Sequence, residues 1–312
     1  MKNKKVVVTG GAGFIGSNIA KELAIKNHVI AIDDLSTGDI KNIQDLIDSK
    51  KIEFIKGSIT DLELLKKTFK NVDYVFHEAA IPSVPRSVKD PVRSNFVNVN
   101  GSLNVLIAAR DNCVKKVVYA SSSSVYGDTP TLPKKEDMKT YPLSPYAVSK
   151  LTAEYYCQVF ANIYNLSTIS LRYFNVYGPH QNPNSEYAAV IPKFIKSILN
   201  DKKPTIYGDG EQTRDFTYIE DVVNANIIAA ESEQNGIFNI GGGKCTSIKE
   251  LASIIMKICE KTLDLDYQQP RHGDIKHSLA DISKAEKKLN YKPKFNLEDG
   301  LKETIKWFKI RI

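Results

Sequence analysis

A tyrosine and a lysine stand four residues apart in the segment SPYAVSK, as Tyr146 and Lys150. The segment begins a helical pattern, so this spacing places both side chains on one face of a helix. Tyrosine is too weak an acid to serve as a base near neutral pH unless its phenolate is stabilised, and a neighbouring cation does this. The pair is therefore suited to removing a proton from a hydroxyl group.

A glycine-rich loop, VVVTGGAGFIG, lies near the start of the chain between a strand pattern and a helix pattern. Gly10 allows a tight turn, Gly13 lets the backbone approach a pyrophosphate, and Gly16 allows close packing of helix on strand. Asp33 ends the next strand pattern, 17 residues after Gly16, where a carboxylate would bind the ribose hydroxyls of adenosine. The loop therefore predicts a dinucleotide site.

The cofactor choice follows from the charges around Asp33. Asp33 and Asp34 would repel a 2′-phosphate, and no arginine stands near them in the sequence. NAD is thus favoured over NADP. We expect Tyr146 to take a hydroxyl proton while hydride leaves the same carbon for NAD, with Lys150 and the oxidised nicotinamide stabilising the phenolate.

The elements that must position these residues can be read from short apolar runs. Strands are expected at 4–10, 28–33, 52–57, 72–79, 115–121 and 167–174, and helix-length segments at 92–111 and 145–164 lie between them. This alternation is typical of an α/β fold with a Rossmann-type, doubly wound parallel sheet.

The alternation ends after Phe174, where Pro and Gly cluster. Helices are expected at 187–200, 247–260 and 298–309, another is led by Asp221, and a strand is expected at 238–241. We therefore predict an NAD-binding domain at 1–174 and a smaller α/β substrate-binding domain at 175–312, with a segment near 215–240 returning to the first.

The GxxGxxG spacing and the Tyr–Lys pair resemble the extended branch of the short-chain dehydrogenase/reductase superfamily. In that branch the residue four positions before the Tyr of VYG bonds the reacting oxygen, and here it is Ser122. Relatives that eliminate water carry Asp and Glu at the next two positions, and decarboxylating relatives keep the Glu. This chain has Ser123 and Ser124. A hydroxyl cannot remove a C5 proton, which favours oxidation at one carbon followed by re-reduction.

That chemistry fits a UDP-sugar 4-epimerase, and the resemblance runs nearly the full length of the chain. It rests on TGGAGFIGS, HEAAIPSVPRS, SSSSVYGD, PLSPYAVSK, LRYFNVYG, GDGEQTRDF and RHGDIKHSLADISKA. The segments SVPRS, YAAVIPK and HSLADISKA are most similar to UDP-N-acetylglucosamine 4-epimerases, and the chain is also similar to UDP-glucose 4-epimerases. The resemblance implies oxidation at C4, rotation of the 4-keto sugar about its diphosphate, and hydride return to the opposite face.

Position by position, the resemblance implies a set of binding residues. For the cofactor these are Gly10, Gly13, Phe14, Ile15, Gly16, Asp33, Asp34, Ser36, Gly38, Ser58, Ile59, Ala79, Ala80, Ile81, Asn98, Ala120, Ser121, Tyr146, Lys150 and Tyr173. For the UDP-sugar they are Ser83, Ser122, Ser123, Ser124, Tyr146, Asn175, Ala189, Val190, Lys193, Tyr207, Arg214, Arg271, Asp274 and Ser278. Among these, Arg214 and Arg271 would hold the diphosphate, Asp274 the uridine ribose, and Ala189 and Val190 the uracil.

Two positions bear on specificity. Relatives usually carry Asp where this chain has Ser58, and a serine accepts the adenine amino group more weakly. In relatives restricted to UDP-glucose and UDP-galactose a bulky Tyr matches Ser278, so the smaller Ser would leave room for a 2-acetamido group. We expect UDP-GlcNAc and UDP-GalNAc to be interconverted, with UDP-Glc and UDP-Gal as further substrates.

Three alternatives stay open: a UDP-glucose/galactose 4-epimerase without N-acetyl activity, a UDP-uronate 4-epimerase, and a non-catalytic NAD(H)-sensing protein. The uronate reading is less favoured because Arg86 alone is a candidate for binding a sugar carboxylate. The sensing reading is disfavoured because such proteins typically lose the Tyr–Lys pair.

The composition excludes several other classes. The formal net charge is +7, but the lysines are spread out and no basic stripe is interleaved with aromatics, so nucleic-acid binding is not expected. The four cysteines lack metal spacing, and His77 and His272 are expected to be structural. No apolar run reaches membrane-spanning length, and the N-terminal run is interpreted as a strand, not a signal peptide. We expect a cytoplasmic protein that dimerises through the helices at 92–111 and 145–164 of each copy.

Overall fold

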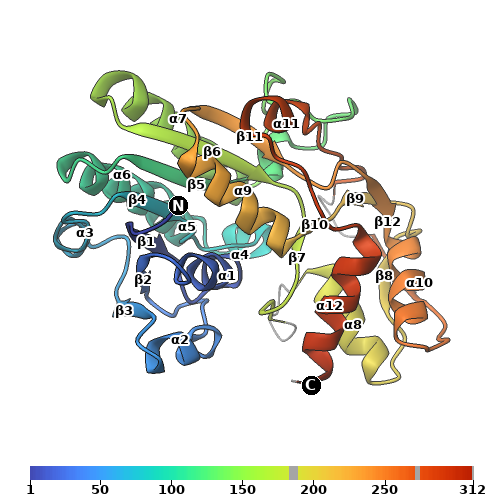
Figure 1. Ribbon diagram of the computed structural model, residues 1–312. Helices are drawn as coiled ribbons and strands as arrows, with labels where there is room; N and C mark the ends of the chain where they lie inside the picture. Colours follow the sequence, from blue (N-terminus) through green and yellow to red (C-terminus); the bar gives the residue numbers. More distant parts are fainter. Residues whose placement is uncertain (183–188, 271–274, 311–312) are drawn as a thin grey trace.

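A parallel sheet of seven strands forms the centre of the molecule, in the order β11-β6-β5-β4-β1-β2-β3 (Figure 1). The computed structural model describes residues 1–182, 189–270 and 275–310. The strands of this sheet are β1 (Lys5–Thr9), β2 (His28–Asp33), β3 (Ile52–Lys56), β4 (Tyr74–His77), β5 (Lys116–Ser122), β6 (Ser167–Tyr173) and β11 (Gly236–Ile240). The predicted Rossmann-type sheet is confirmed, and the strand expected at 238–241 is its seventh strand.

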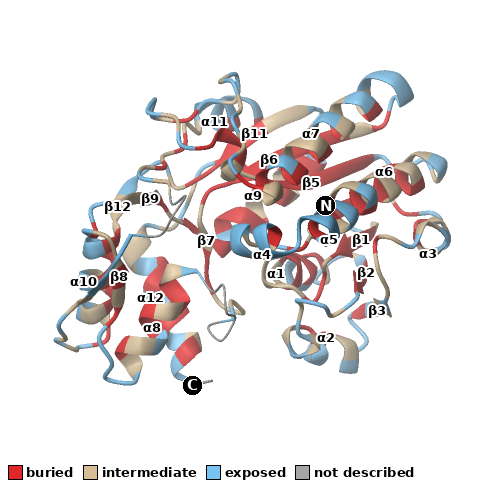
Figure 2. Ribbon diagram, turned by 180° about the vertical axis from the view of Figure 1, so that it is seen from behind, coloured by how far each residue is buried: buried red, intermediate tan, exposed pale blue. Residues whose placement is uncertain are grey.

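Each central strand buries both of its faces, as expected when helices cover both sides of a parallel sheet. In β1, Val6 and Val8 pack into one hydrophobic core while Val7 packs into the other. The continuous buried runs of β1, β2 and β5 follow from this arrangement, and Figure 2 shows them in red. The sheet thus separates two apolar layers.

Helices α1 (Phe14–Leu23) and α9 (Ile219–Glu231) pack together on one face of the sheet. Helices α3 (Leu62–Thr68), α6 (Gly101–Asp111) and α7 (Pro145–Tyr164) cover the other. The short helices α2 (Gln44–Asp48), α4 (Val84–Lys89) and α5 (Pro91–Asn95) lie in the connections. The helix expected at 92–111 consists of α5, a π-helical turn at Phe96–Asn100, and α6.

The rest of the chain builds a smaller body beside the carboxyl ends of the strands (Figure 1). Its helices are α8 (Val190–Leu199), α10 (Ile248–Ile258) and α12 (Leu297–Lys309), while α11 (Ser283–Leu289) packs on β11 of the main sheet. Its strands pair two by two: β7 (Val176–Tyr177) with β10 (Thr217–Tyr218), β8 (Thr205–Tyr207) with β13 (Asp266–Gln268), and β9 (Thr213–Asp215) with β12 (Cys245–Ser247). Because α9 packs on the main sheet and β11 pairs with β6, we propose that residues 219–240 belong to the first domain.

Candidate active site

The glycine loop forms a cradle between β1 and α1. Gly10 has a φ of +68°, and a Cβ there would lie 2.7 Å from the backbone nitrogen of Ala79, so a side chain is excluded. Gly13 caps α1 without a side-chain hydrogen bond. The first backbone N–H groups of α1, at Phe14 and Ile15, therefore face an anion-binding position. This cradle fits a dinucleotide pyrophosphate.

Asp33 ends β2 beside this cradle. Its carboxylate accepts hydrogen bonds from the backbone of Ala12 (3.0 Å) and Leu35 (2.8 Å). A Cβ on Gly38 would lie 2.9 Å from both carboxylate oxygens, so the loop after β2 closes tightly over Asp33. Burial raises the pKa of Asp33, and the two backbone donors oppose this shift. A carboxylate held in this way suits the ribose hydroxyls of NAD.

Other predicted cofactor residues surround the same edge of the sheet. Asp34 accepts a hydrogen bond from the backbone of Ser36 at 2.9 Å. The hydroxyl groups of Ser58 and Thr60 are hydrogen-bonded at 2.9 Å, and Ile59 between them is buried. The segment Ala79, Ala80 and Ile81 follows β4 directly.

Asn98, in the π-helical turn, uses its amide on the protein. It accepts from the backbone of Ile81 at 2.7 Å and donates to Ser149 at 3.0 Å. It therefore fixes the position of the 79–81 segment that follows β4.

The fold adds one fact to the choice between NAD and NADP. Ser36 and Thr37, after Asp33 and Asp34, share a cavity with Arg86, Lys89 and Arg93. No arginine is close to Asp33 and Asp34 in the sequence, but Arg86 and Arg93 line the same cavity as the residues that follow them. The preference for NAD therefore depends on the repulsion of a 2′-phosphate by Asp33 and Asp34.

Tyr146, Lys150 and Ser122 meet where β5 ends against α7. The Lys150 ammonium donates to the carbonyl of Ala120 at 2.8 Å and lies 5.9 Å from the centre of the Tyr146 ring. Burial lowers the pKa of Lys150 to about 8, while Glu78 and Glu154 raise it. Burial raises the pKa of Tyr146 to about 12, and a hydrogen bond with Ser122 lowers it. The structure thus brings the three predicted catalytic residues together.

The four serines point in different directions. The Ser124 hydroxyl donates to the Ser122 hydroxyl at 2.9 Å, while Ser123 begins the short helical turn Ser123–Tyr126 after β5. Ser121 hydrogen-bonds the buried carboxylate of Glu154 behind the strand. Its side chain is therefore committed to the interior, and only its backbone can contribute to the predicted cofactor site.

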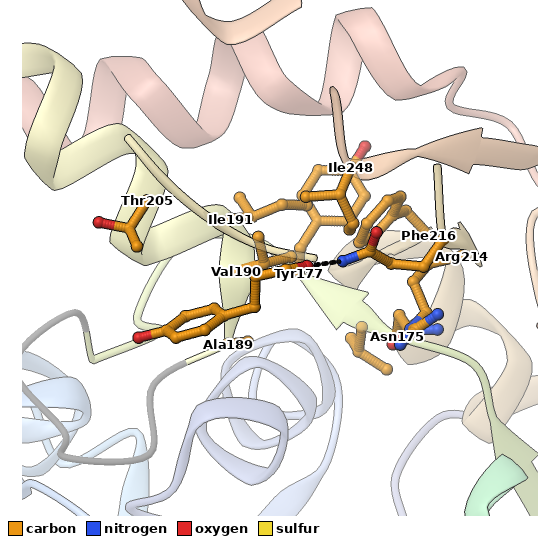
Figure 3. Close-up of a pocket in the computed structure, with 12 residues that line it drawn as sticks. Asn175, Tyr177, Ala189, Val190, Ile191, Thr205, Arg214, Phe216 and Ile248 are labelled. Atoms are coloured by element: carbon orange, nitrogen blue, oxygen red, sulfur yellow. Dashed lines mark hydrogen bonds between the residues drawn. The ribbon is translucent and has the colours of Figure 1, made fainter. Parts of the chain in front are cut away.

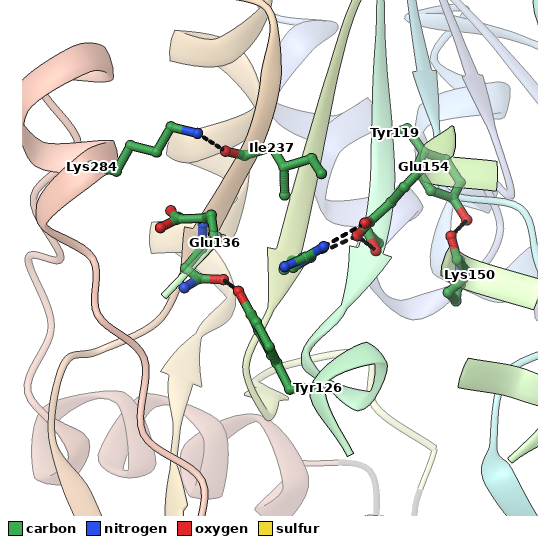
Figure 4. Close-up of polar contacts among 10 residues, drawn as sticks. Tyr119, Tyr126, Glu136, Lys150, Glu154, Ile237 and Lys284 are labelled. Carbon is green, nitrogen blue, oxygen red and sulfur yellow. Dashed lines mark hydrogen bonds and ion pairs between the residues drawn. The ribbon is translucent and has the colours of Figure 1, made fainter. Parts of the chain in front are cut away.

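Glu154 and Arg172 form a buried ion pair behind the catalytic residues. The guanidinium binds both carboxylate oxygens, with Nε at 2.9 Å and Nη2 at 2.7 Å. Figure 4 shows Glu154 near Tyr119, whose hydroxyl donates to the backbone oxygen of Lys150 at 3.4 Å. The pair links α7 to β6 and was missed by sequence reasoning, although Glu154 stands one helical turn beyond Lys150.

A second carboxylate, Glu78, also escaped the sequence analysis. It follows His77 at the end of β4 and accepts a hydrogen bond from the hydroxyl of Tyr173 at 3.0 Å. Asn226 on α9 bonds the same hydroxyl. Burial raises the pKa of Glu78 to about 7, against the effects of Tyr173 and Lys150. The signal available was a charged residue directly after the apolar strand pattern that ends in His77.

Five of the predicted substrate residues line a cavity of about 230 Å³ beside β7 and α8 (Figure 3). Asn175, Ala189, Val190, Tyr207 and Arg214 line it. Sequence reasoning did not assign the other lining residues, which are Val176, Tyr177, Ile191, Thr205, Gln212, Phe216 and Ile248. Gln212 and Phe216 belong to the motif GDGEQTRDF, which was the available signal.

Four predicted substrate residues lie elsewhere or cannot be placed. Ser83 caps α4 with a φ of +90°, and Lys193 lies on α8. Arg271 and Asp274, like His272, lie outside the described residues.

Ser278 is almost fully buried, and its backbone donates to Thr213 at 3.1 Å next to Arg214. The segment around Ser278 is pinned, because Asp215 accepts from the backbone of Ala280 (3.1 Å) and Gly242 (2.7 Å).

His77 has an interior role. Its ring bonds Thr9 at 2.8 Å and Ser102 at 2.8 Å, and burial lowers its pKa to about 3. Within the described ranges no group of His, Cys, Asp and Glu side chains has the geometry of a metal site. Nor does any helix in those ranges have the length and apolarity needed to cross a bilayer.

The fold and the cradle define an NAD-binding enzyme of the Rossmann class, and comparison with known proteins gives its family. The model of the NAD dependent epimerase/dehydratase family matches residues 6–241. The chain belongs to this family, whose cofactor is NAD.

Three known proteins illustrate the similarity. A putative UDP-glucose 4-epimerase of Methanocaldococcus jannaschii is 42% identical over 97% of this chain and 98% of its own. The structure of a UDP-N-acetylglucosamine 4-epimerase of Methanobrevibacter ruminantium, in complex with UDP-N-acetylmuramic acid, is 48% identical and covers 100% of both chains with a TM-score of 0.97. The UDP-glucose 4-epimerase of Thermotoga maritima, solved with UDP-glucose, is 38% identical with a TM-score of 0.94, covering 98% of this chain and 99% of that one.

Proposed function

We propose that this protein is a UDP-sugar 4-epimerase that interconverts UDP-GlcNAc and UDP-GalNAc and also accepts UDP-Glc and UDP-Gal. The observation that carries the proposal is the meeting of Tyr146, Lys150 and Ser122 with serines, not carboxylates, at positions 123 and 124. An elimination needs an acid and a base at those positions, and a hydroxyl supplies neither. The family's dehydratase chemistry is thereby disfavoured for this chain.

The residues present suit an oxidation that is later reversed. NAD, when bound, supplies the hydride acceptor at C4 and the hydride donor on return. Ser122 bonds the reacting oxygen. Tyr146, with its phenolate stabilised by Lys150, takes the C4 hydroxyl proton and gives it back after the 4-keto sugar has turned about its diphosphate. Arg214 would hold that diphosphate, and Arg271 is proposed to join it.

The acetylated substrate pair is favoured by the small residue at Ser278. A serine leaves more room than the tyrosine that matches it in relatives restricted to UDP-glucose and UDP-galactose. The similarity to the M. ruminantium UDP-N-acetylglucosamine 4-epimerase, at 48% identity, supports the same choice. Similarity to UDP-glucose 4-epimerases supports the alternative, an enzyme without N-acetyl activity.

A direct assay separates these functions. The purified protein is incubated with UDP-GlcNAc, UDP-GalNAc, UDP-Glc, UDP-Gal and UDP-glucuronate, first without and then with added NAD, and the products are resolved by chromatography. We expect epimers of the four neutral sugars. Conversion of UDP-Glc and UDP-Gal alone would establish an enzyme without N-acetyl activity. Conversion of UDP-glucuronate alone would establish a uronate epimerase. Loss of water from any substrate would contradict the proposed chemistry.

We also propose that two copies associate through α7 and the helix that contains α5. α5 and α7 pack side by side. Exposed apolar side chains stand at Val92 on α5 and Phe96 in the π-helical turn that follows it, and at Tyr155, Val159 and Ile163 on α7. Their spacing of four residues gives each helix an apolar stripe facing away from its own core.

Analytical ultracentrifugation tests the dimer. Ile163→Glu and Val92→Glu should convert dimer to monomer, because each places a charge in the proposed interface. Ile25→Glu is the matched control, since Ile25 is equally exposed at 66% but lies just after α1, outside this surface. A wild-type protein that sediments as a monomer at all concentrations would contradict the proposal.

A further inference from the structure

Glu78 sits on the floor of the cofactor cradle. A Cβ on Gly10 would lie 3.0 Å from the backbone carbon of Glu78, so the glycine loop packs directly on this residue. Its carboxylate reaches toward β6, where the Tyr173 hydroxyl donates to it at 3.0 Å. The Asn226 side chain on α9 donates to that hydroxyl at 2.8 Å and to the backbone of Val222 at 2.9 Å, which fixes the Tyr173 hydroxyl in place. The carboxylate is thus oriented, not merely enclosed.

A buried carboxylate is costly unless a cation compensates it. In the parallel pairing of β4 with β5, His77 lies opposite Tyr119, so Glu78 follows beside Ala120, whose carbonyl accepts from the Lys150 ammonium at 2.8 Å. Lys150 is therefore the cation beside Glu78, and its charge favours the ionised form of Glu78. The same attraction raises the pKa of Lys150 against the desolvation that lowers it. The two groups, one just after β4 and one on α7, therefore stabilise each other's charge across the catalytic centre.

The other ionisable groups around Lys150 do not offer an equivalent charge. Glu154 also faces Lys150 but is bound at both oxygens by Arg172. Tyr119 and Tyr146 are phenols whose pKa values burial raises, and burial lowers the pKa of His77 to about 3, so all three are neutral near pH 7. Among the described residues, Glu78 is the carboxylate near Lys150 that no other cation binds.

Lys150 is charged in the proposed mechanism while a second cation, the oxidised nicotinamide, lies in the same site. Two like charges at short range lower the pKa of the one that can lose a proton. A neutral Lys150 would no longer stabilise the Tyr146 phenolate. We propose that Glu78 is a positioning residue that supplies the counter-charge keeping Lys150 protonated while the oxidised cofactor is bound. This inference rests on the proposed roles of Tyr146 and Lys150.

The pH dependence of the epimerase reaction tests the inference. In Glu78→Gln the alkaline limb of the kcat profile should move to lower pH by about one unit, so that activity falls about tenfold more at pH 8.5 than at pH 6.5. Glu78→Asp, whose carboxylate is one methylene farther from Lys150, should show a smaller shift in the same direction. Glu53→Gln is the control for loss of one carboxylate, because Glu53 lies exposed on β3. A purely structural role of Glu78 would lower activity equally at every pH.

Cofactor binding gives a readout that does not depend on turnover. The dissociation constants of NAD and NADH are measured by calorimetry at pH 8 for the wild type and Glu78→Gln. Loss of the anion should weaken binding of the cationic NAD severalfold relative to NADH, although release of a proton by Lys150 offsets part of this effect.

The outcomes are distinguishable. A wild type that converts no UDP-sugar would refute the proposed function, while the binding ratio would still test Glu78. An active wild type whose alkaline limb and NAD/NADH binding ratio are both unchanged in Glu78→Gln would refute this inference. Melting curves identify a variant that fails to fold. In that case Glu78→Asp takes its place, and an unshifted wild-type profile in Glu78→Asp would likewise refute it.

Discussion

The Lys150 ammonium donates a 2.8 Å hydrogen bond to the carbonyl of Ala120, joining α7 to the carboxyl end of β5. This contact aims the lysine at the strand that ends in Ser122, so that the helix and the strand bring their functional groups to one place.

Tyr146→Phe should abolish epimerisation while leaving the fold and NAD binding largely intact. The change removes one hydroxyl, the proposed base, so kcat should fall by at least about 10²–10⁴-fold. Tyr155→Phe on the same helix is the matched control, because Tyr155 is 53% exposed and outside the site. Retention of most of the wild-type kcat in Tyr146→Phe would show that the base is another group.

Ser124→Glu should lose epimerase activity without efficient gain of elimination. The Ser124 hydroxyl donates to Ser122 at 2.9 Å, and a carboxylate there would compete with Tyr146 for the Ser122 proton. Ser124→Ala should be less damaged, because it removes a hydrogen bond but adds no charge. Mass spectrometry of the products provides the test, and clean formation of a dehydrated 4-keto-6-deoxy sugar would refute our interpretation of the serines.

Ser278→Tyr should keep activity on UDP-Glc and UDP-Gal and lose it on the acetylated pair. Ser278 is nearly buried, and the Asp215 carboxylate pins the neighbouring Ala280 backbone, so the segment cannot move aside for a larger side chain. The comparison is kcat/KM for both pairs in both proteins. A wild type that converts UDP-Gal readily but not UDP-GalNAc would refute the proposal that Ser278 leaves room for the acetamido group.

Glu154→Gln should destabilise the protein by about 3–5 kcal/mol, because it leaves the Arg172 guanidinium buried without a counter-charge. The exposed pair Lys302–Glu298 is the control, and Glu298→Gln should cost less than about 1 kcal/mol. Urea denaturation at pH 7 measures both changes. Equal effects of the two substitutions would mean that Arg172 finds another partner or reaches water.

The titration of His77 should account for part of the pH dependence of the free energy of unfolding. Burial lowers its pKa from 6.5 to about 3, so its contribution is fully present above pH 6.5 and is lost as the pH falls toward about 3. Between pH 7 and pH 5 this loss amounts to about 2 kcal/mol by linkage. Urea denaturation of His77→Gln should show a correspondingly smaller decrease over this interval, whereas the exposed His28→Gln should follow the wild type.

Much of the fold was determined by local patterns. Val6, Val7 and Val8 are all buried and point alternately into the two cores, because successive side chains of a strand lie on opposite faces. A continuous apolar run of this kind predicts a strand that is buried on both faces. The four-residue spacing of Tyr146 and Lys150 likewise put both on one face of α7. The glycine loop was recognisable because its geometry is contained within one turn.

Tertiary structure alone decided which distant groups meet. Glu78 and Tyr173 are 95 residues apart and become partners because β4 and β6 flank β5 in the sheet. The packing of α7 on β6 brings Arg172 to Glu154. The fold also brings Arg86 to the cavity of Ser36, which the sequence analysis regarded as free of arginine. Sequence periodicity determines the direction of a side chain on its own element, whereas the charges that it meets depend on the order in which the strands pack.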